Sequence, residues 1–350
     1  MFPPLSYLSW ARQQYGDLPY DLATSGVPPA QIADLGPILD LADPFAHAAF
    51  QCALAARYRV PTAEIVPCLG TTGALFVVYA ALFSRGDVIL VEEPTYEPLV
   101  RTAEALGLQV RRFPRTLAEG YRIEPEAVAR ALSPDVRGVV VSHLHNPSGI
   151  AASDDALRQI AGLLSSRGGH LIVDEVYGEL AAPRGTTRSL APNVVAVSSL
   201  TKCFGLGFLR AGWIFLPAAH ARAAEEVLIH AAGHLPSPSL SLAAAGVVAA
   251  DALAARRGAL MAGKRARIDA FVEEHPQLSW CPPHPRSLFG FVHHRRPEGL
   301  RARLEQGRRD HGVLAVPGEF FGDPKGFRLG FTLPLDRLDE ALSRLSRVVR

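Results

Sequence analysis

The chain has 350 residues, of which 36 are basic and 34 acidic, so its formal net charge is +2. This near balance gives no basic surface of the kind that binds nucleic acid or an anionic membrane. With 48% hydrophobic and 20% charged residues, the composition is typical of a globular protein and excludes a disordered one. The length allows one large domain and a smaller one.

The cysteines and the N-terminal segment indicate in which cellular compartment the protein is expected. The four cysteines contain no C-x-x-C pair, which argues against a disulfide framework and a zinc site, so we expect no metal and a reducing compartment. Residues 1–10 lack the basic start and apolar core of a signal peptide, and the most apolar stretch, 240–250, is too short to span a bilayer. We expect a soluble cytoplasmic protein that binds neither membranes nor nucleic acid.

Between residues 64 and 213, short apolar segments alternate with helical periods. We expect strands over 88–91, 109–113, 136–142, 170–173, 194–198 and 211–216, and helices over 75–83, 99–106, 125–132 and 154–166. Short apolar strands separated by helices are typical of βαβ units and of a mainly parallel sheet that is covered on both faces. The predicted fold class is α/β.

The C-terminal part has a different pattern. We expect a long helical tract from Pro236 to about Ala270, then strands over 288–293, 313–316 and 327–331, and a last helix over 336–349. This mixed order predicts a second, smaller α+β domain. We expect the large domain over residues 45–245 and the small domain from residues 1–44 and 246–350.

Lysine is rare in this chain, because only three of the 36 basic residues are lysines. A general bias toward arginine explains the ratio, but arginine cannot lose its proton and a lysine can, so a lysine is needed where chemistry requires a nucleophilic amine. Lys264 fits a solvated helix face and Lys325 fits a loop. Lys202 instead follows an apolar strand and precedes a glycine-rich turn.

Ligands of open α/β sheets bind at the carboxyl ends of the strands, and four strand ends carry unusual polar clusters. They are Gly70-Thr71-Thr72-Gly73, His145-Asn146-Pro147-Ser148-Gly149, Asp174-Glu175-Val176-Tyr177, and Ser198-Ser199-Leu200-Thr201-Lys202 with Arg210 eight residues further on. Taken singly, each also fits a capped helix start or a turn. The glycines at 205, 207 and 212 do not form G-x-G-x-x-G, which argues against a nicotinamide enzyme.

In this order and approximate spacing, the clusters resemble the class I and II aminotransferase family of fold-type I pyridoxal-phosphate enzymes, over roughly residues 21–331. The matching motifs are Gly70-Thr71-Thr72-Gly73, Pro94-Thr95-Tyr96, Asn146-Pro147-Ser148-Gly149, Asp174-Glu175-Val176-Tyr177, Ser199-x-x-Lys202, Arg210 and Arg328-Leu329-Gly330-Phe331. The resemblance implies a fold-type I transferase, pyridoxal 5′-phosphate as cofactor, an amino acid and a 2-oxo acid as substrates, and a homodimer.

The resemblance also implies a role for each matching residue. It implies that Lys202 forms a Schiff base with the cofactor and moves a proton between the substrate Cα and the cofactor. It implies that Asp174 pairs with the pyridine nitrogen, and that Tyr177 and Asn146 hydrogen-bond the phenolic oxygen. The remaining implied cofactor contacts are Gly70, Thr71, Thr72, Ser199 and Arg210 at the phosphate, and Tyr96 on the ring face, where a surface turn tyrosine is the alternative.

Two further residues are implied to meet the substrate. On the expected strand 327–331, Arg328 points opposite to Phe327 and Leu329. The resemblance implies that its planar guanidinium binds the substrate α-carboxylate, with an edge-strand arginine as the alternative. Gly26 resembles a segment whose backbone approaches the substrate, and family members often have a cis bond at the position of Asn146-Pro147.

The chain departs from the family at residues 41–47. Members often have a tyrosine there that reaches the phosphate of the neighbouring subunit, and this stretch has none. His47 is the candidate replacement, and an ordinary helix residue is the alternative.

We predict an aminotransferase that moves an amino group from an amino acid to a 2-oxo acid through a Lys202 Schiff base. A decarboxylase, a C–S or other lyase, and an amine oxidase are alternatives on the same scaffold, because the cofactor permits all of these reactions. A non-catalytic ligand sensor would carry a DNA-binding extension, for which we expect no room before Asp21.

Overall fold

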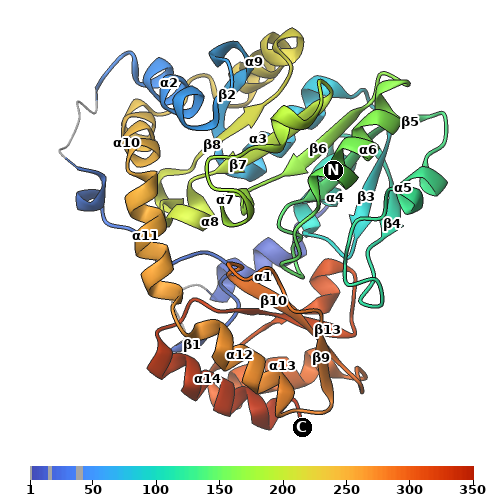
Figure 1. The fold of residues 1–350 in the computed structure, drawn as a ribbon, viewed down its shortest axis with the longest axis vertical. Helices are drawn as coiled ribbons and strands as arrows, with labels where there is room; N and C mark the ends of the chain where they lie inside the picture. Colours follow the sequence, from blue (N-terminus) through green and yellow to red (C-terminus); the bar gives the residue numbers. More distant parts are fainter. Residues whose placement is uncertain (1, 15–17, 37–41) are drawn as a thin grey trace.

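The computed structural model describes residues 2–14, 18–36 and 42–350. A seven-stranded sheet of order β2-β8-β7-β6-β5-β3-β4 forms the centre of the larger part, at the top of Figure 1. β8 alone runs antiparallel to its neighbours, so the sheet is mainly parallel, as predicted. The strands are β2 Ile65–Leu69, β3 Val88–Glu93, β4 Gln109–Pro114, β5 Val136–Ser142, β6 His170–Asp174, β7 Val194–Ser199 and β8 Ala211–Phe215.

Helices cover both faces of this sheet. Alternate residues of β5 face opposite layers, because Val140 packs with the apolar side of α3 while Val139 and Val141 pack with α6. A strand buried on both faces is therefore apolar at every position, which explains its run of valines. The helices are α2 Ala46–Tyr58, α3 Gly70–Leu82, α4 Glu97–Ala105, α5 Pro125–Ala131, α6 Asp154–Ser165, α7 Gly178–Ala181, α8 Thr201–Phe204, α9 Ala218–Ala232, α10 Ser237–Val248 and α11 Ala250–Met261.

The smaller part, at the bottom of Figure 1, contains an antiparallel sheet of order β12-β13-β10-β9 and a parallel pair, β1 and β11. One apolar cluster joins Leu22, Ile268, Phe327 and Leu342, so the segment after β1 packs with the C-terminal helices. The elements are β1 Tyr20–Asp21, α12 Lys264–Glu273, β9 Leu278–Trp280, β10 Phe289–His294, α13 Leu300–His311, β11 Val313–Leu314, β12 Val316–Pro317, β13 Gly326–Gly330 and α14 Leu335–Val348. The division at residues 45 and 245 stays a prediction.

Four local predictions were wrong. The tract 236–270 is three helices, with a bend of 71° between α10 and α11, because α10 packs on α2 in the large part while Arg257 of α11 hydrogen-bonds the Cys203 carbonyl. The expected strand 313–316 divides between two sheets. The glycine-rich cluster at Gly70 is already the first turn of α3, and the cis bonds lie at Glu93-Pro94 and His143-Leu144, so the bond after Asn146 is trans.

Helix α1, Ser6–Gln14, lies between the large sheet and β10 in Figure 1. The carboxylate of Glu97, the first residue of α4, accepts hydrogen bonds from the backbone N–H groups of Ser6 at 3.0 Å and Tyr7 at 2.6 Å. These are amides that a helix start otherwise leaves without partners. The N-terminal end of α1 is thus fixed to the start of α4.

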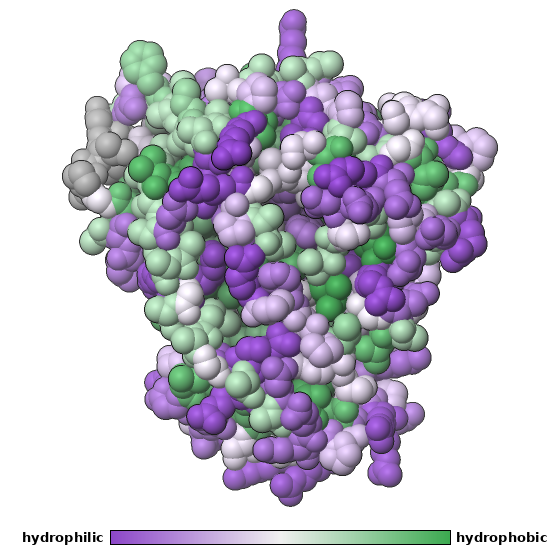
Figure 2. All heavy atoms as spheres, in the orientation of Figure 1, coloured by the Kyte–Doolittle hydropathy of each residue, from purple (hydrophilic) through white to green (hydrophobic). Residues whose placement is uncertain are grey.

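The face drawn in Figure 2 is mixed in polarity, and hydrophobic residues gather at its upper left, over α2 and α10. Within the described ranges, no single helix is both long and apolar enough to cross a membrane. α10 and α11 meet that criterion only when they are joined across their 71° bend.

The strand β8 crosses the start of α3 at Gly212, where there is no room for a side chain. A Cβ at this position would lie 2.6 Å from the Gly70 carbonyl carbon and 2.8 Å from the Ser198 carbonyl oxygen. We predict that Gly212→Ala lowers the free energy of unfolding by about 1–3 kcal/mol, because backbone atoms must move. Denaturant unfolding measures this. The control is Gly258→Ala on the exposed side of α11, where an added Cβ meets nothing within 4 Å and is expected to stabilise the helix; equal stability of both variants contradicts the prediction.

Candidate active site

A cavity of about 640 Å³ lies at the carboxyl edge of the large sheet, closed from the other side by α1 and β13. Two predicted residues, Gly26 and Gly70, lie behind its wall, where added Cβ atoms would meet Lys202 Cδ at 3.2 Å and Arg210 Nη2 at 2.5 Å. The structure thus brings together every residue predicted for the site. Those that line the cavity are Thr71, Thr72, Tyr96, Asn146, Asp174, Tyr177, Ser199, Lys202, Arg210 and Arg328.

Strand register places these side chains. Ser142 at the end of β5 pairs with Asp174 at the end of β6, and Asp174 pairs with Val197 of β7. β7 then ends at Ser199, and the single turn of α8 carries Lys202. Since parallel strands all end at the same edge, residues far apart in the sequence reach one cavity.

Asp174 is a buried carboxylate without a cationic hydrogen-bond partner among the described residues. Its Oδ1 accepts a hydrogen bond from the Val176 N–H at 3.1 Å. Burial raises the pKa of Asp174 to about 7, and the nearby charge of Glu92 raises it further. The carboxylate would be stabilised by a positively charged group placed in the cavity.

Lys202 has the opposite electrostatic environment. Burial lowers the pKa of its amine to about 8, and the guanidinium groups of Arg328 and Arg210 lower it as well. Its backbone carbonyl accepts a hydrogen bond from the Val27 N–H at 3.0 Å, which holds the segment containing Gly26 against the lysine. At neutral pH about a tenth of such amines are unprotonated and nucleophilic, far more than for an ordinary lysine.

An anion-binding cradle lies at the start of α3. The hydroxyl of Thr71 donates to Ser199 Oγ at 3.0 Å, and the Arg210 guanidinium lies against Gly70, with only a 3.5 Å contact from Nη1 to the Gly207 carbonyl. Helix N-terminal amides, hydroxyl groups and an uncommitted guanidinium together suit a phosphate.

Arg328 of β13 is fully buried. Its Nη1 donates to Asn146 Oδ1 at 2.9 Å, and its Nη2 donates to the Ala23 carbonyl at 2.9 Å and to the Tyr7 hydroxyl at 2.7 Å. Its Nε has no partner, and within the described ranges no carboxylate forms an ion pair with it. A buried guanidinium without a counter-ion is a site for a bound anion.

Two tyrosines complete the wall. The Tyr177 hydroxyl donates to Ser25 Oγ at 2.9 Å, and burial raises the pKa of both Tyr177 and Tyr96, so both phenols are neutral at physiological pH. The ring of Tyr96 lies edge-on to that of Tyr7, with centroids 5.7 Å apart.

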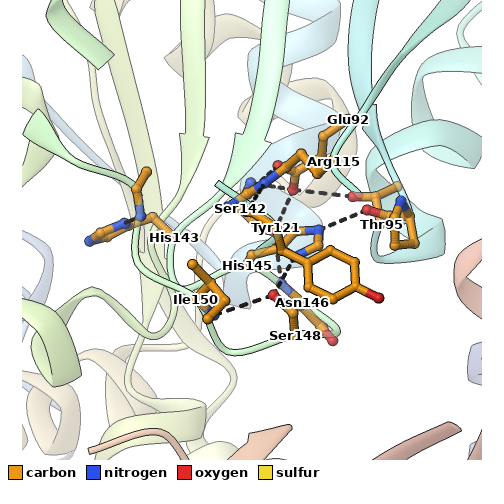
Figure 3. Close-up of polar contacts among 12 residues, drawn as sticks. Glu92, Thr95, Arg115, Tyr121, Ser142, His143, His145, Asn146, Ser148 and Ile150 are labelled. Carbon is orange, nitrogen blue, oxygen red and sulfur yellow. Dashed lines mark hydrogen bonds and ion pairs between the residues drawn. The ribbon is translucent and has the colours of Figure 1, made fainter. Parts of the chain in front are cut away.

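A buried ion pair lies beside the turn that carries Asn146, and Figure 3 shows its polar contacts. Glu92 Oε2 accepts from Arg115 Nη1 at 2.7 Å, and both side chains are fully buried. Glu92 Oε1 accepts from the Ser142 N–H and hydroxyl at 2.7 and 2.5 Å, and Ser142 Oγ accepts from the Asn146 N–H at 3.0 Å. The charge of Glu92 thus fixes the turn that carries Asn146.

Sequence reasoning missed Tyr7, Glu92, Arg115 and Ser142. Glu92 carries the same signal that identified Asp174, because it is an acid at the end of an apolar strand. Tyr7 carries no such signal. It also lines a second cavity of about 80 Å³, together with Trp10, Asp21 and Lys202.

Residues 42–47 of the stretch that departs from the family are described by the structure, and Leu41 lies outside the described residues. His47 is exposed on α2, and it does not line the cavity of its own chain. Partial burial lowers the pKa of its imidazole, while the nearby charge of Glu225 on α9 raises it. In the part of the chain that the structure describes, no three histidine, cysteine, aspartate or glutamate side chains are grouped as a metal site would require.

Comparison with known proteins agrees with this geometry. Residues 15–345 match the family model of aminotransferase class I and II. Capreomycidine synthase of Streptomyces vinaceus is 26% identical, over 96% of this chain and 91% of the relative, and an arginine–pyruvate transaminase of Pseudomonas aeruginosa is 28% identical, over 82% and 75%. The crystal structure of a pyridoxal-phosphate-dependent cyclase, OrfR, superposes with a TM-score of 0.89 at 26% identity and covers 99% of this chain and 97% of that one.

The family model spans nearly the whole chain, and the superposition extends over both parts of the fold. The chain therefore belongs to the class I and II aminotransferase family, as a pyridoxal 5′-phosphate-dependent aminotransferase of fold type I.

Proposed function

We propose that Lys202 is the nucleophile and the proton carrier of an amino-group transfer from an amino acid to a 2-oxo acid. The observation that carries this proposal is the amine of Lys202, with its pKa lowered to about 8, in one cavity with Asp174, Arg210 and Arg328. The amine can therefore attack a carbonyl carbon in one step and accept a proton in another.

The residues of the cavity fit pyridoxal phosphate. Asp174 has no cationic hydrogen-bond partner among the described residues, and a protonated pyridine nitrogen would supply one. The cradle at Gly70, Ser199 and Arg210 suits the phosphate. Asn146 and Tyr177 line the same cavity, where they would hold the phenolic oxygen. When bound, the cofactor supplies an electron-accepting ring that stabilises negative charge on the substrate α-carbon.

The chain's own residues orient the substrate. Arg328 has no carboxylate partner among the described residues, so its charge is available to the substrate α-carboxylate. Asn146 and the Ala23 carbonyl fix the plane of the guanidinium, and a carboxylate that binds in this plane places the substrate α-carbon near the cofactor face. Lys202 Nζ can then remove the proton from that carbon.

A second reaction class on the same site is favoured by one observation. Of the three relatives described above, two are a synthase and a cyclase by name, and the third is a transaminase. A reaction that retains the carboxylate at Arg328 and then closes a ring or eliminates a group would use the same residues, because the cofactor stabilises the same α-carbon charge.

A homodimer is part of the proposal. Phe45, Leu69, Phe208 and Val248 are large apolar side chains that the single chain leaves exposed. Leu69 and Phe208 are close in sequence to Gly70 and Arg210 of the anion cradle, so a second copy at this surface would cover the cradle. Cytoplasmic location stays a prediction.

Transamination is tested by incubating the yellow holoenzyme with a panel of L-amino acids, including L-arginine, L-aspartate and L-alanine. We expect the absorbance of the bound cofactor to shift to that of its amine form while one equivalent of 2-oxo acid appears. Release of ammonia or carbon dioxide, or a cyclic product with the cofactor spectrum restored, would assign the second reaction class instead.

The role of Lys202 is tested by Lys202→Ala. We expect turnover to fall by at least about 100-fold, since both a nucleophile and a base are lost, and the cofactor to become removable by gel filtration. The matched control is Lys325→Ala, which removes an exposed lysine from a loop of the small domain and should leave both properties intact. Full turnover in the Lys202 variant contradicts the assignment.

The raised pKa of Asp174 predicts a pH dependence of the cofactor-free protein. The folded-state pKa of about 7 lies above the ordinary value of 3.8, so between these pH values the folded state binds the proton more tightly than the unfolded state. Its contribution is present at low pH and is lost as pH rises through about 7.

We therefore expect the stability of the cofactor-free wild type, relative to Asp174→Asn, to decrease from about pH 5 to pH 8 in denaturant titrations. The difference between the two proteins removes the contribution of Glu175, whose pKa burial also raises to about 7. Parallel stability curves would show that Asp174 is ionised throughout.

A further inference from the structure

We propose that Tyr7 is part of the substrate-carboxylate site, where its hydroxyl donates a hydrogen bond to the α-carboxylate that Arg328 binds. This inference rests on the proposed function, because it requires an amino acid with its carboxylate at Arg328. It gives helix α1 a direct role in binding, which none of the sequence motifs indicates.

The hydrogen-bond arrangement leaves the Tyr7 proton available. The hydroxyl oxygen accepts from Arg328 Nη2 at 2.7 Å, and an accepting phenol still has its own O–H to donate. No acceptor for this O–H is present among the described residues. Both Nη2 protons are already donated to Tyr7 and the Ala23 carbonyl, so a bound carboxylate would accept from the free proton of Nη1 or Nε and from the Tyr7 O–H.

Arg328 also has no ion-pair partner within the described ranges of the chain. The Arg328 guanidinium lies over the rings of Tyr7, Phe289 and Phe321, at 5.5, 5.6 and 5.1 Å from their centroids. Aromatic faces stabilise the cation, but they do not neutralise it. A carboxylate has about four lone-pair positions, so it can accept from the guanidinium and from Tyr7 at the same time.

Tyr7 is held in this position before any ligand binds. The Glu97 carboxylate binds its backbone N–H, and its ring packs edge-on against Tyr96 and Phe320, at 5.7 and 5.9 Å between centroids. The side chain is 8% exposed and lines both cavities beside Lys202. A donor fixed in this way loses little freedom when it binds the carboxylate.

The test is Tyr7→Phe, which removes the hydroxyl and keeps the ring packing. The probes are the best donor from the amino-acid panel and the amine left when that donor loses its carboxyl group, such as L-arginine with agmatine or L-alanine with ethylamine. Titration of the cofactor absorbance of the holoenzyme gives the dissociation constant of each. We expect the dissociation constant of the amino acid to rise about 10- to 100-fold, the effect of one hydrogen bond to a charged group, and that of the amine to stay unchanged.

Two further variants, one at the partner residue and one control, are measured in the same way. Arg328→Lys should weaken the amino acid relative to the amine in the same direction, because it loses the planar fork. Tyr121→Phe is the matched control, since it deletes a buried phenol hydroxyl that contacts His293 Nε2 at 2.8 Å, and it should leave both constants unchanged.

Equal weakening of amino acid and amine in Tyr7→Phe would mean that Tyr7 only packs over the site, and unchanged binding of both would mean that its hydroxyl makes no contact. Either outcome overturns the proposal. A wild type whose cofactor spectrum responds to no amino acid would instead refute the proposed function, and this inference with it.

Discussion

The register of β5, β6 and β7 is the constraint on which the site depends. Side chains alternate along a strand, so a slip of one residue would turn Asp174 away from the cavity and toward a helix layer. Ile172 and Val173 already occupy the two opposite layers, and their fit to α3 and α6 fixes the register. The apolar packing of the sheet thus determines where the polar ends of the strands meet.

Charge distribution extends this constraint. Glu92 and Arg115 neutralise each other behind the cavity, whereas Lys202, Arg210 and Arg328 face it without carboxylate partners among the described residues. The buried ion pair therefore holds Asn146 in place, and the unpaired cations are available to bind anions such as the cofactor phosphate and the substrate carboxylate. The same excess of positive charge lowers the pKa of Lys202. The same positive charges thus explain both the binding of anions in the cavity and the nucleophilic amine of Lys202.

The sequence was sufficient for the large sheet and for most of the site, for a common reason. The β-branched strands are buried on both faces, and the polar clusters follow their ends directly, so local pattern and tertiary position coincide. Where they do not coincide, prediction was wrong or incomplete. The alanine-rich tract 236–270 has no strong breaker at Ala249, and at its 71° bend α10 packs on α2 while α11 packs on α8.

Tyr7 is the clearest case of a residue that local pattern cannot identify. It lies in a short helix of mixed polarity, and its partner Arg328 is 321 positions away in the sequence. Arg115 is likewise 23 positions from Glu92, in a stretch with several other arginines. Such contacts are properties of the folded chain, because nothing in either segment specifies the other.

The scarcity of lysine has a practical consequence for chemical modification. Of the three lysines, Lys264 is buried with its Nζ hydrogen-bonded to the Thr332 carbonyl, and Lys202 lies in the cavity, so Lys325 is the lysine that the surface presents. Guanidinium groups do not react with acylating reagents under mild conditions because they keep their proton. A fluorescent ester would therefore label the exposed lysine of this protein at one position, directly before β13, without any engineered cysteine.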